Sequence, residues 1–444
     1  MNYPPKSLWG RLKYIGPSVI VTGSVVGSGS IVMTPLLGAA AGFTLLWWLL
    51  LSMWSKPIIQ AEISRYILVT RKTFLEAFAD MPGFKTTIKG KTTSWLVWFM
   101  FIGVVPSIAG MGGLAGAVAE AGHMMIPQIN VAAWVVISCL LTWFILYWGS
   151  YQTLERILLM MVLFFSLVTM VIAFSMQATP YEINSTQVYE GLSFNFPMDH
   201  LPLALAVFGF TGISYGEIMA YTYWCLEKGY APDNEGDLEK TKGWIKVMQT
   251  DVWVTVIFIT IGTLRFFFLG AGVLHQVPEL QEALSNNSFW DIDIIGALQN
   301  MFALVLGSWA KWLFVALAFF VLFSTLLSGT AAFTRTIADY FISTGLILEK
   351  EDTRLKLIKI IAFVIPFLSG VFYFILPNPI TLFIIAGIWA ALGLPIVNIG
   401  ALFLISKLEK ELQPKTATKM ILWATLCFQV FIGFLLLIDN FKGI

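Results

Sequence analysis

Two short stretches combine glycines and hydroxyl side chains inside segments that are otherwise apolar. Residues 22–30 read TGSVVGSGS, and residues 209–217 read GFTGISYGE and end in Glu217. Glycines of this kind interrupt a helix and free its backbone amides and carbonyls, which is costly in hydrocarbon unless the backbone lines a cavity. Backbone groups, hydroxyls and one carboxylate can together bind a small solute. The two stretches therefore predict a binding site.

The second stretch also contains Gly212-Ile213-Ser214-Tyr215-Gly216, which matches the G-x-S-x-G pattern of serine hydrolases. That chemistry needs a strand-to-helix turn and a histidine base. The three histidines, His123, His200 and His275, fall at the outer ends of apolar segments, whereas Ser214 falls near the middle of one. We therefore expect no catalytic residue and no enzymatic activity.

Both stretches lie in a chain with too few charges for a water-soluble protein. Of its 444 residues, 58% are hydrophobic and 12% are charged, whereas soluble domains have about 25% charged residues. The mean hydropathy is +0.80. The composition indicates a polytopic membrane protein and excludes a cytosolic enzyme, a nucleic-acid-binding protein and a disordered scaffold. Cys139, Cys225 and Cys427 lie in apolar runs and imply no disulfide framework.

Apolar segments of about 20 residues, the length that crosses a bilayer as a helix, recur along the chain. We predict an all-α protein with eleven membrane-spanning helices in a single transporter domain that covers residues 1–444. The predicted helices are residues 14–37, 43–69, 94–123, 130–149, 154–177, 199–229, 247–274, 310–343, 357–376, 379–406 and 420–440.

Lysine and arginine counts in the connections support this segmentation. Every second connection is basic, and the alternate connections hold no Lys or Arg. Cytoplasmic loops are enriched in these residues. We therefore expect an integral protein of the plasma or inner membrane, with its N-terminus in the cytoplasm and its C-terminus outside. The basic connections, which hold 21 of the 27 Lys and Arg residues, are 1–13, 70–93, 150–156, 226–246, 344–359 and 407–419.

The two polar stretches fall in the first and sixth predicted helices. These helices correspond to one another in a five-plus-five inverted repeat, with repeats at about residues 14–177 and 199–406 and an extra helix at about 420–440. Secondary transporters bind their substrates where paired helices of two repeats are interrupted near mid-membrane. We therefore expect both helices to be broken there.

Several motifs, spread over nearly the whole chain, resemble those of the Nramp family. The resemblance implies a LeuT-type fold of the amino acid–polyamine–organocation superfamily, and family members that mostly carry transition-metal ions, usually with protons. The motifs are Gly16-Pro17, Gly42 to Trp47, Leu49 to Ser52, Arg65 with Val69-Thr70, Tyr151 to Glu155, Trp309 to Phe314, Ser324-Thr325, Ser328 to Thr330 and Leu394-Pro395.

The metal ligands of that family, however, have no counterparts in this sequence. The Asp-Pro-Gly-Asn motif falls on residues 27–30 (GSGS), the Met-Pro-His motif falls on residues 213–215 (ISY), and the helix-10 glutamine falls on Gly387. Transition-metal ions prefer thioether, imidazole or carboxylate ligands, so we expect no metal site. Residues 26–31 also resemble the first-helix break of amino-acid permeases, where backbone N–H groups bind a carboxylate.

Charged side chains inside the spans are also candidate site residues, because they are rare and costly there. Lys56 and Glu217 share a depth and could neutralise each other, and Arg265 lies in the seventh helix. We expect these three to act in coupling or charge pairing, and Arg335 and Asp339, spaced i, i+4, to form a structural pair. The substrate-binding candidates are Thr22, Ser24, Gly27, Ser28, Gly29, Ser30, Thr211, Ser214, Tyr215, Glu217, Gly387 and Trp389.

These residues favour a secondary transporter that moves a small, uncharged polar organic solute by alternating access. Hydroxyls, backbone amides, one carboxylate and aromatic rings suit a monosaccharide best and an amino acid second. Glycines at the family's ligand positions are expected to widen the cavity. We expect transport to be uncoupled or weakly coupled to protons, with the lipid bilayer as a further partner and no cofactor or nucleic acid.

Two alternatives remain open. The first is an Nramp-like, proton-coupled transporter of a hard, hydrated divalent cation such as Mg²⁺, anchored at Glu217. The second is a transport-inactive sensor or regulatory membrane protein.

Overall fold

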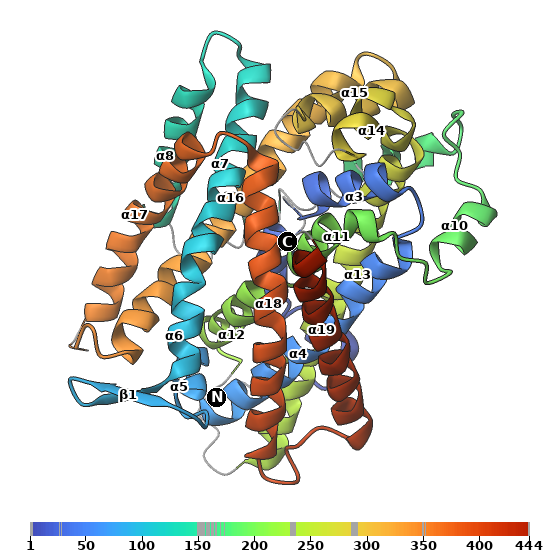
Figure 1. Ribbon diagram of the computed structural model, residues 1–444. Helices are drawn as coiled ribbons and strands as arrows, with labels where there is room; N and C mark the ends of the chain where they lie inside the picture. Colours follow the sequence, from blue (N-terminus) through green and yellow to red (C-terminus); the bar gives the residue numbers. More distant parts are fainter. Residues whose placement is uncertain are drawn as a thin grey trace.

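The computed structural model describes residues 3–25, 27, 29–148, 174–230, 237–285, 292–348, 350 and 352–442, with single positions between 156 and 172. The described part is built almost entirely of helices (Figure 1). They are α1 (Leu8–Leu12), α2 (Pro17–Val25), α3 (Thr34–Ala41), α4 (Leu46–Thr70), α5 (Phe74–Ala79), α6 (Trp95–Ile102), α7 (Val104–Met125), α8 (Val131–Trp148), α10 (Ser185–Gly191), α11 (Leu201–Phe210), α12 (Tyr215–Lys228), α13 (Leu238–Gly272), α14 (Pro278–Ser285), α15 (Ile294–Leu306), α16 (Ala310–Ser343), α17 (Thr353–Ile375), α18 (Pro379–Ser406) and α19 (Thr416–Lys442).

Eight helical segments within the described residues are long and apolar enough to cross a membrane. They match the third, fourth and sixth to eleventh predicted helices. The second predicted helix is α4, and the first is divided into α2 and α3 by a turn and the π-helical segment Gly29–Met33. Most of the fifth, 154–177, lies outside the described residues. The predicted all-α membrane fold is confirmed, whereas the count of eleven and the limits of the repeats remain predictions.

The basic connections and the connections without Lys or Arg lie at opposite ends of the helix bundle. The hairpin of β1 (Lys85–Ile88) and β2 (Lys91–Ser94) lies beside α5 at the end that carries the N-terminus, and α14 and α15 lie at the other end (Figure 1). This separation agrees with the alternation of charge along the chain. Which end faces the cytoplasm remains a prediction.

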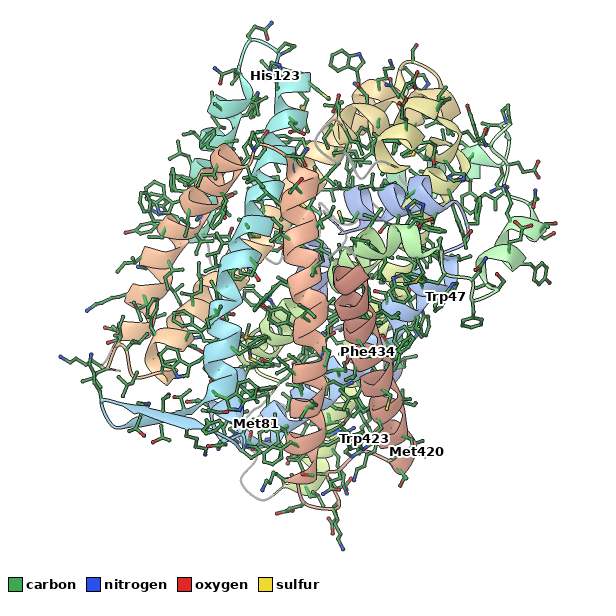
Figure 2. All side chains as sticks on the ribbon, viewed as in Figure 1. Trp47, Met81, His123, Met420, Trp423 and Phe434 are labelled. Carbon is green, nitrogen blue, oxygen red and sulfur yellow. The ribbon has the colours of Figure 1, made fainter. Side chains whose placement is uncertain are left out.

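Large apolar side chains cover much of the outer surface. Met420, Trp423 and Phe434 on α19, which are labelled in Figure 2, are each more than half exposed. Soluble monomers rarely expose contiguous apolar surface of this kind. These side chains are therefore placed to contact lipid.

Glycines allow α7 to approach its neighbours closely. A Cβ at Gly112 would lie 2.7 Å from the carbonyl oxygen of Ser369, and a Cβ at Gly116 would lie 2.1 Å from the ring of Tyr373. Both neighbours belong to α17. The spacing of Gly112 and Gly116 predicts a helix-packing face, and this prediction is confirmed.

Candidate functional site

Both predicted helix breaks are present. α11 ends at Phe210 and α12 begins at Tyr215, and Gly212 between them has φ +73°, a left-handed conformation that favours glycine. On the first helix, α2 ends at Val25 and the π-helical segment begins at Gly29. The two breaks are in contact, because a Cβ at Gly29 would lie 2.9 Å from the carbonyl oxygen of Phe210.

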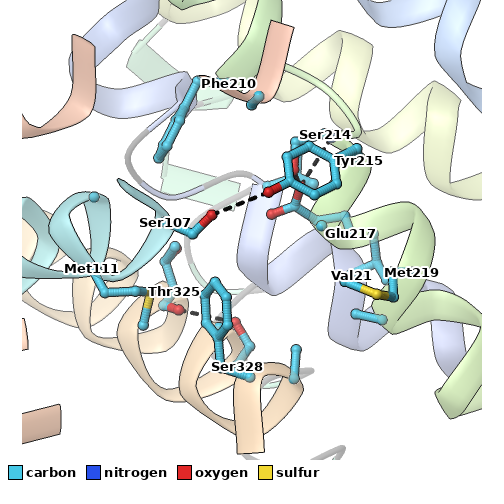
Figure 3. Close-up of a pocket in the computed structure, with 18 of the residues that line it drawn as sticks. Val21, Ser107, Met111, Phe210, Ser214, Tyr215, Glu217, Met219, Thr325 and Ser328 are labelled. Carbon is cyan, nitrogen blue, oxygen red and sulfur yellow. Dashed lines mark hydrogen bonds between the residues drawn. The ribbon is translucent and has the colours of Figure 1, made fainter. Parts of the chain in front are cut away.

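A pocket lies beside these breaks, between α2, α7, α12, α16 and α18 (Figure 3). Its space between atoms is about 920 Å³, part of which is open to solvent. Apolar side chains form most of the wall. The polar residues that line it are Ser107, Ser214, Tyr215, Glu217, Thr325, Ser328 and Thr336.

Glu217 brings a carboxylate into this wall and also caps α12. Its carboxylate accepts hydrogen bonds from the hydroxyl and from the backbone N–H of Ser214, the latter at 2.9 Å (Figure 3). Tyr215, the first residue of α12, directs its hydroxyl towards Ser107 on α7 at 3.5 Å. The helix start at Ser214 therefore places an acid and a phenol in one pocket.

Several hydroxyls of the wall donate their protons to their own helices. Ser107 donates to the carbonyl oxygen of Gly103 at 2.8 Å, Ser328 donates to that of Thr325 at 3.3 Å, and Thr336 donates to that of Ala332 at 3.0 Å. A hydroxyl has one proton and two lone pairs. Towards the cavity, these side chains therefore present hydrogen-bond acceptors.

The pocket brings together four of the residues expected from the sequence, namely Gly29, Ser214, Tyr215 and Glu217. Ser28 lies outside the described residues, and so does the side chain of Ser24.

Other candidates have their partners elsewhere. Thr22 donates to the carbonyl oxygen of Ser18 within α2. The hydroxyl of Ser30 lies 2.8 Å from that of Thr263 on α13. The carbonyl oxygen of Thr211 accepts hydrogen bonds from α4, and its hydroxyl is buried with no partner among the described residues.

Gly387 and Trp389 on α18 lie outside the pocket and pack against neighbouring helices. A Cβ at Gly387 would lie 2.4 Å from the carbonyl oxygen of Ala206, so this glycine allows α18 to pack on α11. The indole of Trp389 stacks on Phe99 with ring centroids 5.2 Å apart. Neither residue is part of the pocket lining.

Gly27 does not widen the cavity as expected. A Cβ at this position would lie 1.5 Å from Oγ1 of Thr325 and 2.4 Å from its Cβ. The space freed by the missing side chain is therefore filled by α16. Gly27 therefore allows α16 to pack closely against the break. Close packing requires the absence of a Cβ, just as a cavity does.

The charged candidates Lys56 and Arg265 lie in different parts of the structure. Lys56 donates hydrogen bonds to two carbonyl oxygens of the α11 end and lies close enough to Glu217 for an electrostatic interaction. Arg265 lies on α13 among apolar residues that include Phe174 and Phe268, away from the pocket at the breaks.

The expected pair of Arg335 and Asp339 is wrong. Arg335 forms a two-pronged ion pair with Glu227 of α12 at 2.5 Å and 3.1 Å. Asp339 pairs with Arg354 of α17 at 2.7 Å. Residues on neighbouring helices offer these side chains better geometry than the i, i+4 partner on their own helix.

Asp251 is a buried acidic residue that the sequence analysis missed. Its carboxylate on α13 accepts hydrogen bonds from the backbone N–H groups of Gly16 and Ser18 at 3.3 Å and 3.1 Å, from the Ser18 hydroxyl at 2.5 Å and from the Tyr221 hydroxyl at 2.8 Å. It therefore caps the start of α2 and joins α2, α12 and α13. Asp251 is the only acidic residue in the predicted seventh helix, and this was the sequence signal that could have indicated it.

The pocket also has thioethers that the sequence did not indicate, from Met111 and Met219. Among the described residues, His, Cys, Asp and Glu side chains do not gather in groups of three or more that could hold a metal ion. An ion bound here would have the carboxylate of Glu217, hydroxyl oxygens and thioethers within reach.

Three comparisons with known proteins agree with this architecture. A family model described as natural resistance-associated macrophage protein-like (Nramp) matches residues 18–439. The uncharacterized protein PM0681 of Pasteurella multocida strain Pm70 is 25% identical over 391 residues, which cover 83% of this chain and 80% of that protein.

Two solved structures share the fold. A mutant of the Eremococcus coleocola manganese transporter has a TM-score of 0.70 at 14% identity, with 97% of this chain and 88% of that chain covered. MhsT in complex with L-phenylalanine has a TM-score of 0.55 at 16% identity, with 98% and 99% covered. Both are transporters of the LeuT-type fold. Because the family model matches nearly the whole chain, this protein belongs to the Nramp family and is a membrane transporter.

Proposed function

We propose that this protein is a secondary transporter of a hard divalent cation that keeps part of its water shell, with Glu217 as the anchoring carboxylate. The observation that carries the proposal is the polar minority of the pocket lining, where the carboxylate of Glu217 lies among hydroxyls that face the cavity as acceptors. Mg²⁺ is typically bound through one or two carboxylates while it retains several waters. Those waters donate hydrogen bonds outward, and the hydroxyl oxygens can accept them.

Family membership supports a divalent cation, since one solved relative is named a manganese transporter. The lining of this pocket favours a hard cation over a soft one, because Glu217 and the hydroxyls are oxygen donors. The two thioethers, Met111 and Met219, are the softer exceptions.

The positive charge of Lys56 is the main argument against a cation. Its ammonium lies on the carbonyl oxygens of Phe208 and Thr211, at the C-terminal end of α11. A helix carries about half a negative charge at that end. The ammonium is therefore partly compensated before Glu217 is counted, and Glu217 retains charge to offer a substrate.

An organic solute is the second candidate, and the apolar wall favours it. Val21, Met111, Phe210 and Phe333 line the same pocket, and such walls suit the apolar part of an amino acid. A monosaccharide is less well supported. It presents acceptors as well as donors, and the hydroxyls of Ser107, Ser328 and Thr336 offer few donors in return.

We also propose that the N-terminus lies in the cytoplasm and that the chain contains the two inverted repeats, as the sequence predicts. We further propose that transport is uncoupled or only weakly coupled to protons, although the resemblance to the family implies transport with protons.

Uptake into proteoliposomes tests the substrate. We expect saturable uptake of Mg²⁺ or Mn²⁺ by the wild type. Glu217→Gln should lower it at least tenfold, about 1.4 kcal/mol, because the anchor loses its charge. Glu279→Gln, which removes an exposed carboxylate on α14, serves as the control and should transport normally.

Two results would contradict the cation proposal. One is uptake of labelled amino acids or sugars without any cation uptake. The other is unchanged cation uptake by Glu217→Gln that is inserted and folded.

A further inference from the structure

The broken end of α11 binds the side-chain amine of a lysine from the same chain. Lys56 of α4 donates from Nζ to the carbonyl oxygen of Phe208 at 2.7 Å and to that of Thr211 at 2.5 Å. Ser52, one turn earlier on α4, donates to the same two oxygens at 3.1 Å each. The Lys56 side chain is fully buried, so protein groups replace all of its water.

The rest of the environment is also that of a cation site. The ring of Phe208 lies 5.1 Å from Nζ, within the range of a cation–π interaction. Glu217 lies close enough for electrostatic attraction across the break. The hydroxyl of Thr211 is buried without a partner among the described residues. Two carbonyl oxygens, the hydroxyl of Ser52 on the same oxygens and the Phe208 ring therefore surround the amine of Lys56.

Carbonyl ends of interrupted helices are where many secondary transporters coordinate Na⁺. Here the helix end presents the same kind of oxygen donors, but an ammonium on a four-carbon tether takes the place of the ion. A tethered ion differs from a dissolved one in a definite way. It cannot leave, so it stabilises the break at every step and adds no dependence on sodium concentration.

We propose that the ammonium of Lys56 takes the place of a bound monovalent cation at the end of α11 and holds that end in position. The inference does not depend on the identity of the substrate, because it concerns how α4 holds the end of α11. Lys56 acts as a positioning residue through the carbonyls of Phe208 and Thr211.

Chemical rescue tests the inference without any substrate. Lys56→Ala removes the ammonium and leaves a space of its size, whereas Lys56→Met removes the charge but fills the space. We would measure the thermal unfolding midpoint of purified protein in detergent with N-methyl-D-glucamine, Na⁺, K⁺ or methylammonium as the only cation. Lys246→Ala, which removes an exposed lysine of α13, is the control for loss of charge.

We expect the midpoint of the wild type and of Lys246→Ala to be the same in all four cations. Lys56→Ala should have a lower midpoint in N-methyl-D-glucamine, and a small cation should restore at least half of the loss. Lys56→Met should be lowered and not restored. A Lys56→Ala protein that is as stable as the wild type, or that no small cation restores more than Lys56→Met, would overturn the inference.

A second measurement does not depend on any variant folding. Uptake by the wild type should be unchanged within twofold when Na⁺ is replaced by N-methyl-D-glucamine. A greater loss of uptake without sodium would show that an exchangeable ion is still required, and the inference would fail. Failure of the cation-substrate proposal would leave the stability experiment unaffected.

Discussion

The packing of Gly27 against Thr325 allows a quantitative test of the first helix break. In Gly27→Ala, the new Cβ would lie 1.5 Å from Oγ1 and 2.4 Å from Cβ of Thr325, whereas ordinary contact begins at 3.4 Å. The break or α16 must therefore move by roughly 1–2 Å. Inserting a methyl group into a packed interior costs about 1–3 kcal/mol. Because three atoms of Thr325 would lie within 3.0 Å of the new Cβ, we expect a loss of about 3 kcal/mol in the free energy of unfolding.

The companion variant Thr325→Gly removes every overlapping atom. On its own it should destabilise the protein by about 1 kcal/mol or more, since it puts a glycine inside α16. Combined with Gly27→Ala, it should recover most of the loss, which gives a coupling energy of about 2 kcal/mol between the two positions.

Equilibrium unfolding in mixed micelles, followed by tryptophan fluorescence, measures these differences. Gly433→Ala is the matched control, because a Cβ at that glycine of α19 would meet nothing within 4 Å. The reasoning is refuted if Gly27→Ala is as stable as Gly433→Ala. It is also refuted if the effects of Gly27→Ala and Thr325→Gly simply add.

Three further outcomes follow from contacts outside the pocket. Asp251→Asn should lower the free energy of unfolding by about 3 kcal/mol, because an amide cannot accept all four hydrogen bonds of the carboxylate. The same unfolding assay measures this loss, and a loss below about 1 kcal/mol would contradict the capping role. A double-mutant cycle of Glu227→Gln and Arg335→Met should give a coupling energy of about 1 kcal/mol. This coupling energy should fall at high salt, since both side chains are partly exposed, and a coupling energy of zero would argue against the ion pair. Gly387→Ala should lower the unfolding midpoint, because its Cβ would lie 2.4 Å from the carbonyl oxygen of Ala206, and an unchanged midpoint would mean that α11 and α18 can separate at no cost.

The spans were predictable because the bilayer imposes a length on apolar sequence. α16 and α18 occupy the predicted residues 310–343 and 379–406 without any shift. α13 is the instructive exception, since it begins at Leu238, nine residues before its predicted start. Its first turns are polar and are capped by Asp237, so hydropathy does not mark them.

The site was only partly predictable, because a residue type does not say what faces it. Ser214, Tyr215 and Glu217 follow a break whose position glycines and hydroxyls indicate, and they do line the pocket. Gly27 carries the same local signal, and Gly387 was a candidate through the resemblance to the family, yet each faces a neighbouring helix. Cavity and close packing both require the absence of a Cβ, and only the tertiary arrangement distinguishes them.

The cap on α2 has a consequence for how the protein is made. Gly16 and its acceptor Asp251 are 235 residues apart in the chain. At a synthesis rate of about 5–20 residues per second, the ribosome needs roughly 10–50 s to pass from one to the other. During that interval the first half-helix has left the ribosome, but the carboxylate that satisfies its leading amides does not yet exist. The N-terminal segment therefore reaches its final place at the membrane only after the seventh helix has been inserted, and nascent chains that stop before α13 must hold this segment by other contacts.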